Sequence, residues 1–220
     1  MAQDATPNVG SDLLRIHRAI TRALEVALSN GQGNTLPEQH RQGYVLYIRA
    51  LDIVLHSHHL GEDELAFPFW KARLPRAPFT TLKRHHREIA AYLKKIEAWL
   101  GEPAAAWQPE SMSALERGLD GLQGLWCTHI ALEEATLGPE NANKYLTPEE
   151  NALLARQLGE HAQAHSQPIE LVMPFMIYNL QPSDRAEFVR LMPPVVVEQL
   201  VPFAWKAAWA PMIPFLVEVG

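Results

Sequence analysis

Apolar residues recur at intervals of three and four along four long stretches of the chain, which is the spacing of one face of an α-helix. Capping residues and helix breakers bound these stretches, so the pattern predicts four helices at about residues 11–28, 37–65, 78–100 and 110–137. Ser11 or Asp12 is expected to cap the first helix, and Pro68 is expected to end the second. Because short loops join antiparallel neighbours, we predict an all-α fold containing an antiparallel up-down-up-down four-helix bundle.

The segments on either side of the bundle have a different character. Residues 1–10 are expected to form a flexible N-terminal tail, and the bundle itself is placed at residues 11–140. After it, Thr147 and Pro148 open a helical segment that runs toward Asn179, with Pro168 and Pro174 as breaks or kinks, and Ser183 can cap a short helix to about Met192. Residues 141–220 are predicted to be a helical C-terminal extension that packs on the bundle or forms an interface, because they are too apolar for a solvated tail.

One histidine interrupts the apolar face of each predicted bundle helix. These residues are His17, His58, His86 and His129. A single histidine in such a position is more often a hydrogen-bonded core residue than a ligand. Here, however, a glutamate follows two of them at i+4, Glu62 after His58 and Glu133 after His129, so that each pair lies on one helical face. Because a buried carboxylate beside an imidazole is costly unless a cation compensates it, the four helices together predict a metal centre.

The types of ligand indicate which metal would bind. Imidazole and carboxylate groups suit iron, manganese or zinc, whereas calcium and magnesium prefer oxygen ligands alone. Six ligands exceed what one structural zinc ion uses, and two glutamates can bridge a pair of ions. The first interpretation is therefore a di-iron centre, with zinc or manganese as alternatives. The predicted metal ligands are His17, His58, Glu62, His86, His129 and Glu133.

Composition excludes several other classes of protein. The formal net charge of −6 and the lack of a basic run argue against a nucleic-acid partner. A single cysteine, Cys127, allows no intramolecular disulfide, and we expect it to be buried and unreactive. No signal peptide is evident, and no apolar run reaches the roughly 18–20 residues that span a bilayer. A soluble cytoplasmic protein without an integral membrane segment is the expectation.

The order and spacing of these residues resemble the hemerythrin-like (HHE cation-binding) family over about residues 10–140. The matching pieces are His17, His58-His59-Leu-Gly-Glu62-Asp63-Glu64-Leu-Ala-Phe67-Pro68, His85-His86-Arg-Glu-Ile89 and His129-Ile-Ala-Leu-Glu133-Glu134. The resemblance implies a bundle whose interior holds two iron ions in an oxo- or hydroxo-bridged centre (Fe–O–Fe or Fe–OH–Fe) that binds oxygen or related small ligands. Carried over by position, it implies the same six ligands.

Two departures distinguish the chain from the oxygen-carrying hemerythrins. Those proteins have a second histidine one turn after the first on the third helix, where this chain has Ala90. Their fourth-helix carboxylate is an aspartate at i+5, whereas here it is Glu133 at i+4, with Glu134 as a rival. A fifth nitrogen could come from His59, from His85, or from His161 and His165, although the last pair is better interpreted as a polar helix face. Both departures favour the hemerythrin-like subgroup over a reversible oxygen carrier.

Three functions are compatible with this pattern. The first is a non-haem di-iron protein that binds oxygen, nitric oxide or peroxide in a sensing or oxidative-stress role. The second is an enzyme with the same centre, a peroxidase-like, catalase-like or oxygen-activating oxidoreductase. The third is a zinc-binding or metal-storage protein. The expected partner is a small diatomic or peroxide ligand, and the C-terminal extension offers a surface for a homodimer or, less well supported because basic residues are few there, for a membrane.

Overall fold

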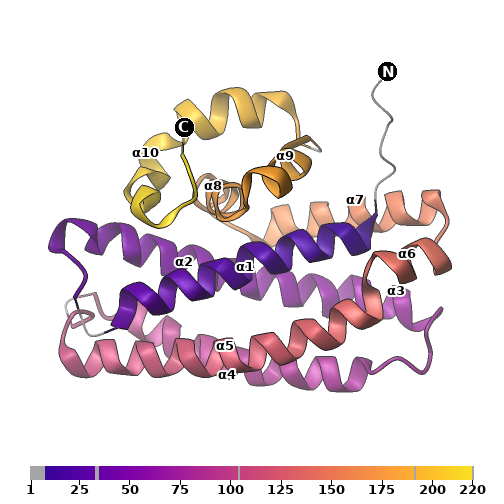
Figure 1. The fold of residues 1–220 in the computed structure, drawn as a ribbon, viewed down its shortest axis with the longest axis horizontal. Coiled ribbons are helices and arrows are strands. Elements are labelled where there is room, and N and C mark those ends of the chain that lie inside the picture. Colours follow the sequence, from indigo (N-terminus) through magenta and orange to yellow (C-terminus); the bar gives the residue numbers. More distant parts are fainter. Residues whose placement is uncertain (1–7, 33–34, 104, 191, 220) are drawn as a thin grey trace.

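The computed structural model of the protein describes residues 8–32, 35–103, 105–190 and 192–219. Within these residues the chain is helical and contains no strand, so the all-α prediction is confirmed. Four long helices run side by side along the long axis of the molecule (Figure 1), and α1 and α5, α5 and α4, α4 and α2, and α2 and α1 pack against each other. They therefore enclose one shared interior. The four helices are α1 (Val9–Gly31), α2 (Glu38–Gly61), α4 (Phe79–Gly101) and α5 (Pro109–Leu137).

The first helix begins earlier than the sequence pattern predicts. Asn8, rather than Ser11 or Asp12, is the N-cap, and its side chain accepts a hydrogen bond from the backbone N–H of Ser11 at 2.9 Å. Gly10 is buried so close to the start of α6 (Pro139–Tyr145) that a Cβ on it would lie 2.5 Å from the carbonyl carbon of Gly138. The expectation of a flexible tail is therefore wrong for residues 8–10, and residues 1–7 lie outside the described part of the chain.

The second helix does not end near Pro68, because a π-helical turn accommodates the proline. This turn, η2 (Glu62–Ala66), continues α2 into α3 (Phe67–Lys71), and the N–H of Phe67 donates to the carbonyl of Glu62 five residues earlier. Pro68 has no N–H to donate, and the carbonyl of Asp63 instead accepts a hydrogen bond from Lys83 Nζ at 3.3 Å. The extra residue in the turn rotates the next part of the helix, so that Ala66 and Phe67 are buried where the periodicity predicted Leu65.

Buried polar residues separate two apolar clusters inside the bundle. On α1, α4 and α5, and on α2 together with its continuation through η2 and α3, the apolar face belongs to a larger cluster on one side of the polar residues and to a smaller cluster on the other side. On α4, for example, Ile89 belongs to the larger cluster and Leu82 to the smaller one, with His86 between them. The smaller cluster contains Val9, Phe67, Trp70, Phe79, Leu82 and Leu137. The polar side chains thus form a layer that is shielded from both ends of the bundle.

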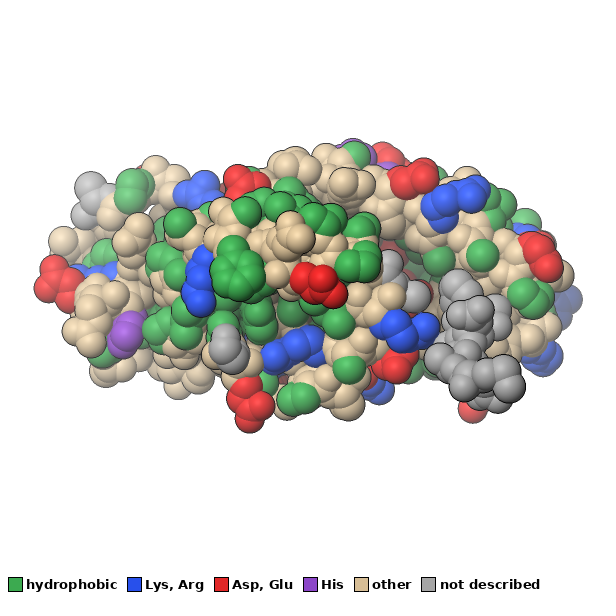
Figure 2. All heavy atoms as spheres, turned by 90° about the horizontal axis from the view of Figure 1, so that it is seen from above, with side chains coloured by type: hydrophobic (Ala, Val, Ile, Leu, Met, Phe, Trp, Pro, Cys, Tyr) green, Lys and Arg blue, Asp and Glu red, His purple; other side chains and the backbone are tan. Residues whose placement is uncertain are grey.

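The C-terminal part of the chain lies across one side of the bundle (Figure 1), where α8 contacts α1 and α2, and η4 contacts α2. The predicted capping signal is confirmed, since Thr147 and Glu150 form a reciprocal capping box at the start of α7. The short turns after residue 193 have no counterpart among the predicted elements. Figure 2 shows hydrophobic side chains on the outward face of this part, and Phe203 is 76% exposed there. Its elements are α7 (Pro148–His165), α8 (Ile169–Asn179), α9 (Pro182–Arg190), η3 (Val196–Ala204), α10 (Lys206–Trp209) and η4 (Ala210–Phe215).

Candidate metal centre

Five histidines and two glutamates from all four bundle helices meet in the polar layer. The structure brings together all six predicted residues and adds one more, His59 of α2. Their side chains are 7% exposed or less. The seven residues are His17 of α1, His58 and His59 of α2, Glu62 of η2, His86 of α4, and His129 and Glu133 of α5. Below we call this set the seven-residue centre.

Each glutamate of the centre lies between a histidine of its own helix and a histidine of another helix. On the same helix, His58 Nε2 lies 3.1 Å from Glu62 Oε1, and His129 Nε2 lies 3.2 Å from Glu133 Oε2, as the i+4 spacing predicts. Across helices, His86 Nε2 is 3.3 Å from Glu62 Oε2, and His17 Nε2 is 3.3 Å from Glu133 Oε2. The two carboxylates therefore link the four helices through their histidines.

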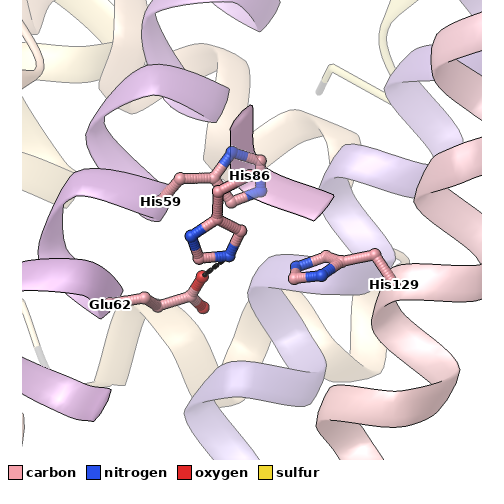
Figure 3. Close-up of side chains that lie close together, drawn as sticks. All are labelled: His59, Glu62, His86 and His129. Carbon is pink, nitrogen blue, oxygen red and sulfur yellow. Dashed lines mark ion pairs between the residues drawn. The ribbon is translucent and has the colours of Figure 1, made fainter. Parts of the chain in front are cut away.

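The ligand atoms fall into two overlapping groups. One group contains His17, His58, Glu62 and Glu133, and the other contains His59, Glu62, His86 and His129. In each group, one nitrogen or oxygen atom per residue lies within 4.8 Å of the others, and Glu62 belongs to both groups. Figure 3 shows the second group, in which the ring of His59 stacks on that of His86 with 4.3 Å between centroids. Two such groups sharing a carboxylate have the arrangement that two adjacent cations require.

The seven-residue centre is polar, buried and short of hydrogen bonds. Both carboxylate oxygens of Glu62 and of Glu133, and both ring nitrogens of His86 and of His129, are buried without a hydrogen-bond partner among the described residues. Leaving a buried polar group unsatisfied costs about 1–3 kcal/mol. Cations bound between these atoms would remove this free-energy cost, because the free lone pairs of the atoms would coordinate them. The residues present therefore fit a metal.

A comparison with protein families also indicates cation binding, and it does so independently of this geometry. The family model of the hemerythrin HHE cation binding domain matches residues 9–140. The chain belongs to this family. The match to the hemerythrin HHE domain runs from the start of α1 into α6 and contains the entire seven-residue centre, which is consistent with cation binding there. The C-terminal extension lies outside the match. No curated protein and no solved structure matches the chain significantly.

The electrostatics of the HHE domain keep most of its buried imidazoles neutral. Burial, followed by the neighbouring histidines, holds the pKa of His58 and of His59 well below the usual value of 6.5. Burial and His129 lower the pKa of His86 to about 4. A histidine must be neutral to bind a metal, so these shifts favour the ligand form at neutral pH.

The two glutamates of the HHE domain respond to burial differently. Burial, together with the nearby charge of Glu133, raises the pKa of Glu62 well above 4.5. Burial also acts to raise the pKa of Glu133, but its contacts with His129 and His17 outweigh burial and hold that pKa well below 4.5. Without a cation, Glu62 thus holds a proton more readily than Glu133.

The other histidines considered as ligands lie outside both groups. His85 is buried, but its ring centroid is 5.9 Å from that of His129 and its Nε2 lies 3.3 Å from Arg84 Nη2. His161 and His165 of α7 stack on each other at 4.1 Å, and His161 Nε2 lies 3.1 Å from Glu64 Oε2. Of the candidates for a fifth nitrogen, only His59 lies among the seven residues.

The prediction that Cys127 is buried is wrong, because this residue is exposed. It lies on α5 two residues before the buried His129, and Thr128 beside it is exposed as well. The apolar face of α5 instead places Trp126 in the interior, next to the histidines.

Within the described part of the chain, no helix is both long enough and apolar enough to cross a membrane.

Proposed function

We propose that the HHE domain of this chain holds two iron ions in the seven-residue centre and binds oxygen or a related small ligand, such as nitric oxide or peroxide, in a sensing or oxidative-stress role. The observation that supports this most directly is the set of buried, unpartnered carboxylate oxygens of Glu62 and Glu133 among five imidazoles. A mixed nitrogen and oxygen donor set suits iron. When bound, two iron ions would supply redox chemistry and positions for an exchangeable ligand.

In this proposal the two groups of residues each hold one ion. His17 and His58 serve one ion, His59, His86 and His129 serve the other, Glu62 lies between them, and Glu133 completes the set. His59 supplies the nitrogen that is missing at Ala90, where oxygen-carrying hemerythrins have a second histidine on the third helix. The contacts among α1, α2, α4 and α5 support the antiparallel up-down-up-down order of the helices, which this assignment assumes.

Two aromatic residues keep bulk water and large molecules from the centre. Trp126 is fully buried, its ring centroid lies 5.3 Å from that of His17, and its indole N–H donates to Thr21 Oγ1 at 2.9 Å. On the other side of the layer, Phe67 stacks on His86 with 5.2 Å between centroids. Because apolar residues cover both sides, a small uncharged ligand fits the centre better than a large or charged organic substrate.

The decisive experiment is a metal count on purified protein combined with its visible spectrum. We expect about two iron ions per chain, with absorption near the ultraviolet edge that coupled ferric ions produce and zinc does not. If protein reconstituted with ferrous iron or with zinc retains neither after desalting, the proposal is wrong. If it retains only zinc, the zinc-binding alternative is correct instead.

Substitutions test which residues hold the ions. His58→Ala and Glu133→Ala are each expected to lower the iron content by at least half, and His59→Ala is expected to lower it as well. His161→Ala is the matched control, since His161 lies outside both groups and should retain the wild-type iron content. Should His85→Ala lose iron while His86→Ala keeps it, the assignment on α4 would have to move by one residue.

The second candidate function is catalysis by the same centre, as a peroxide-reducing or oxygen-activating enzyme. It requires that His59 does not bind the second ion, because Ala90 offers no replacement ligand on α4 and a coordination position then stays open to a substrate. Iron-loaded protein that consumes hydrogen peroxide over many turnovers would establish the enzyme. Iron-loaded protein that changes its spectrum once, without turnover, would establish the binding protein.

A further inference from the structure

Each inner glutamate of the centre is followed directly by a second acidic residue. These tandem pairs are Glu62-Asp63 at the start of η2 and Glu133-Glu134 near the end of α5. The inner members are buried, whereas the side chains of Asp63 and Glu134 are 35% and 34% exposed. Asp63 and Glu134, which we call the outer carboxylates, thus lie at the boundary between the centre and solvent.

The first outer carboxylate, Glu134, holds the far side of His17. His17 Nδ1 is hydrogen-bonded to Glu134 Oε1 at 2.9 Å, while His17 Nε2 lies 3.3 Å from Glu133 Oε2. A neutral imidazole has one N–H and one lone pair, and a carboxylate can only accept. When Nδ1 donates to Glu134, the lone pair must therefore be on Nε2, which faces the interior.

The second outer carboxylate, Asp63, lies beside the outward ring nitrogen of His86, at ion-pair distance but without a hydrogen bond. His86 Nδ1 lies 3.2 Å from Asp63 Oδ1, and His86 Nε2 lies 3.3 Å from Glu62 Oε2. Lys83 Nζ also lies 3.6 Å from Asp63 Oδ1, and it donates a hydrogen bond to the Asp63 carbonyl. The ammonium group of Lys83 thus restrains Asp63 in this position from the outer side. Glu134 is hydrogen-bonded to its histidine, whereas Asp63 lies at ion-pair distance from His86 and has the additional cationic partner.

The two histidines belong to different ligand groups, His17 to one and His86 to the other. Given the proposed function, on which this inference rests, we propose that Glu134 and Asp63 are positioning residues, each controlling the affinity of one of the two cations. A carboxylate behind a metal-binding imidazole fixes its tautomer and orientation and makes it a better donor, and its loss typically costs about 10–100-fold in affinity. Each outer carboxylate therefore acts on one cation through one histidine.

Stepwise metal titration tests the assignment. Metal-free wild-type protein and the variants Glu134→Ala and Asp63→Ala are titrated anaerobically with ferrous iron, and in parallel with zinc in a calorimeter. We expect each variant to weaken one of the two binding steps about 10–100-fold and to leave the other nearly unchanged. Glu134→Gln should recover part of the loss, because its amide oxygen can still accept from His17 Nδ1.

A double-mutant comparison identifies which histidine each carboxylate serves. Glu134→Ala should have no further effect on metal affinity once His17 is alanine, but should keep its full effect when His86 is alanine. Asp63→Ala should show the reverse. Glu64→Ala is the control, since Glu64 is acidic, follows Asp63 directly and pairs with His161 instead of a residue of the centre.

The possible failures are distinguishable. If wild-type protein takes up two ions and both alanine variants bind them with unchanged affinity, the inference is wrong while the proposed function stands. If wild-type protein takes up no metal, the proposed function fails and the inference fails with it. Urea unfolding of each variant separates loss of fold from loss of affinity, and Glu134→Gln and Asp63→Asn, which preserve shape, serve where an alanine variant does not fold.

Discussion

Two clusters of buried polar side chains in the described part of the chain can be compared, because they differ in how their hydrogen bonds are completed. In the first, Tyr47 Oη donates to Asn179 Oδ1 at 2.6 Å, and Arg22 Nη1 donates to the same oxygen at 2.5 Å and to the carbonyl of Phe215 at 3.0 Å. Asn179 Nδ2 in turn donates to the carbonyl of Phe175 at 2.9 Å. In the second cluster, the seven-residue centre, the oxygens of Glu62 and Glu133 have no such partner among the described residues.

Burial of polar groups therefore serves two purposes in this protein. The Arg22–Tyr47–Asn179 network is complete within the protein and joins α1 and α2 to the C-terminal extension, so it stabilises the tertiary structure. The seven-residue centre is incomplete within the protein, and the two proposed cations would supply its missing partners. If this distinction holds, metal and acid should act on the second cluster alone, and a substitution in the network should act on stability alone.

The largest expected effect is that of metal removal on stability. Iron-loaded protein and protein stripped with a chelator should differ in free energy of unfolding by about 4 kcal/mol for each cation, when free metal exceeds the dissociation constant about 1,000-fold. The physical reason is that the cations bind the folded centre and have no comparable site in the unfolded chain. Urea unfolding with and without ferrous iron measures this difference. Identical midpoints for the two forms would contradict the distinction between the clusters.

Acid should destabilise the metal-free protein through His58, His59 and His86 of the centre. The pKa of His86 is about 4 in the folded protein and 6.5 in a free chain, so the folded state binds fewer protons between these values. Its contribution to stability is present above pH 6.5 and is lost as the pH falls toward 4, which amounts to about 3 kcal/mol. His58 and His59 act in the same direction.

Glu62 and His17 oppose this trend, because a raised pKa gives stability that is present below the ordinary value, 4.5 for Glu62 and 6.5 for His17, and is lost as the pH rises through the folded pKa. Unfolding curves of metal-free protein between pH 7.5 and 4.5 measure the net effect. His86→Gln, which cannot titrate, should show a shallower dependence on pH than the wild type. If the stability of His86→Gln depended on pH as steeply as that of the wild type, His86 would be excluded as a source of the pH dependence.

Loss of Asn179 tests the complete cluster. Asn179→Leu leaves the Tyr47 hydroxyl and Arg22 without their buried acceptor, so we expect a loss of about 2 kcal/mol in the free energy of unfolding. The iron content should remain that of the wild type, since the network shares no residue with the centre. Asn143→Ala, which removes an exposed amide, is the control. A loss of iron in Asn179→Leu at full folding would show that the two clusters are coupled.

The smallest expected effect is that of modifying Cys127. Because its side chain is exposed, a maleimide should label it in the native protein, and the free energy of unfolding should change by less than about 0.5 kcal/mol. The iron content should not change either, although His129 is only two residues away. Thiol labelling followed by a metal count measures both. Failure to label the native protein would mean that this face of α5 is covered in solution.

The local part of the site could be predicted from the sequence because it depends on helical periodicity alone. His58 and Glu62, like His129 and Glu133, are i+4 pairs, and any helix places such a pair on one face. Each of the four predicted bundle helices has one histidine in its apolar face, and this was enough to predict that the four histidine side chains meet. The capping box at Thr147 was likewise predictable, because it involves only residues three positions apart.

The remainder was decided by the tertiary structure. Pro68 looked like the end of a helix, but a π-helical turn and the side chain of Lys83 accommodate it, and neither is visible in a 3.6-residue period. His59 lies at the margin of its helical face, so only the packing of α2 against its neighbours determines that it joins the centre while His85 does not. Helical periodicity alone shows which helices carry the candidate ligands and at what spacing, since those are local properties. Which fifth histidine joins the centre, and which of the described buried polar atoms have no hydrogen-bond partner, depended on how the helices rotate against each other, because those contacts join residues far apart in the chain.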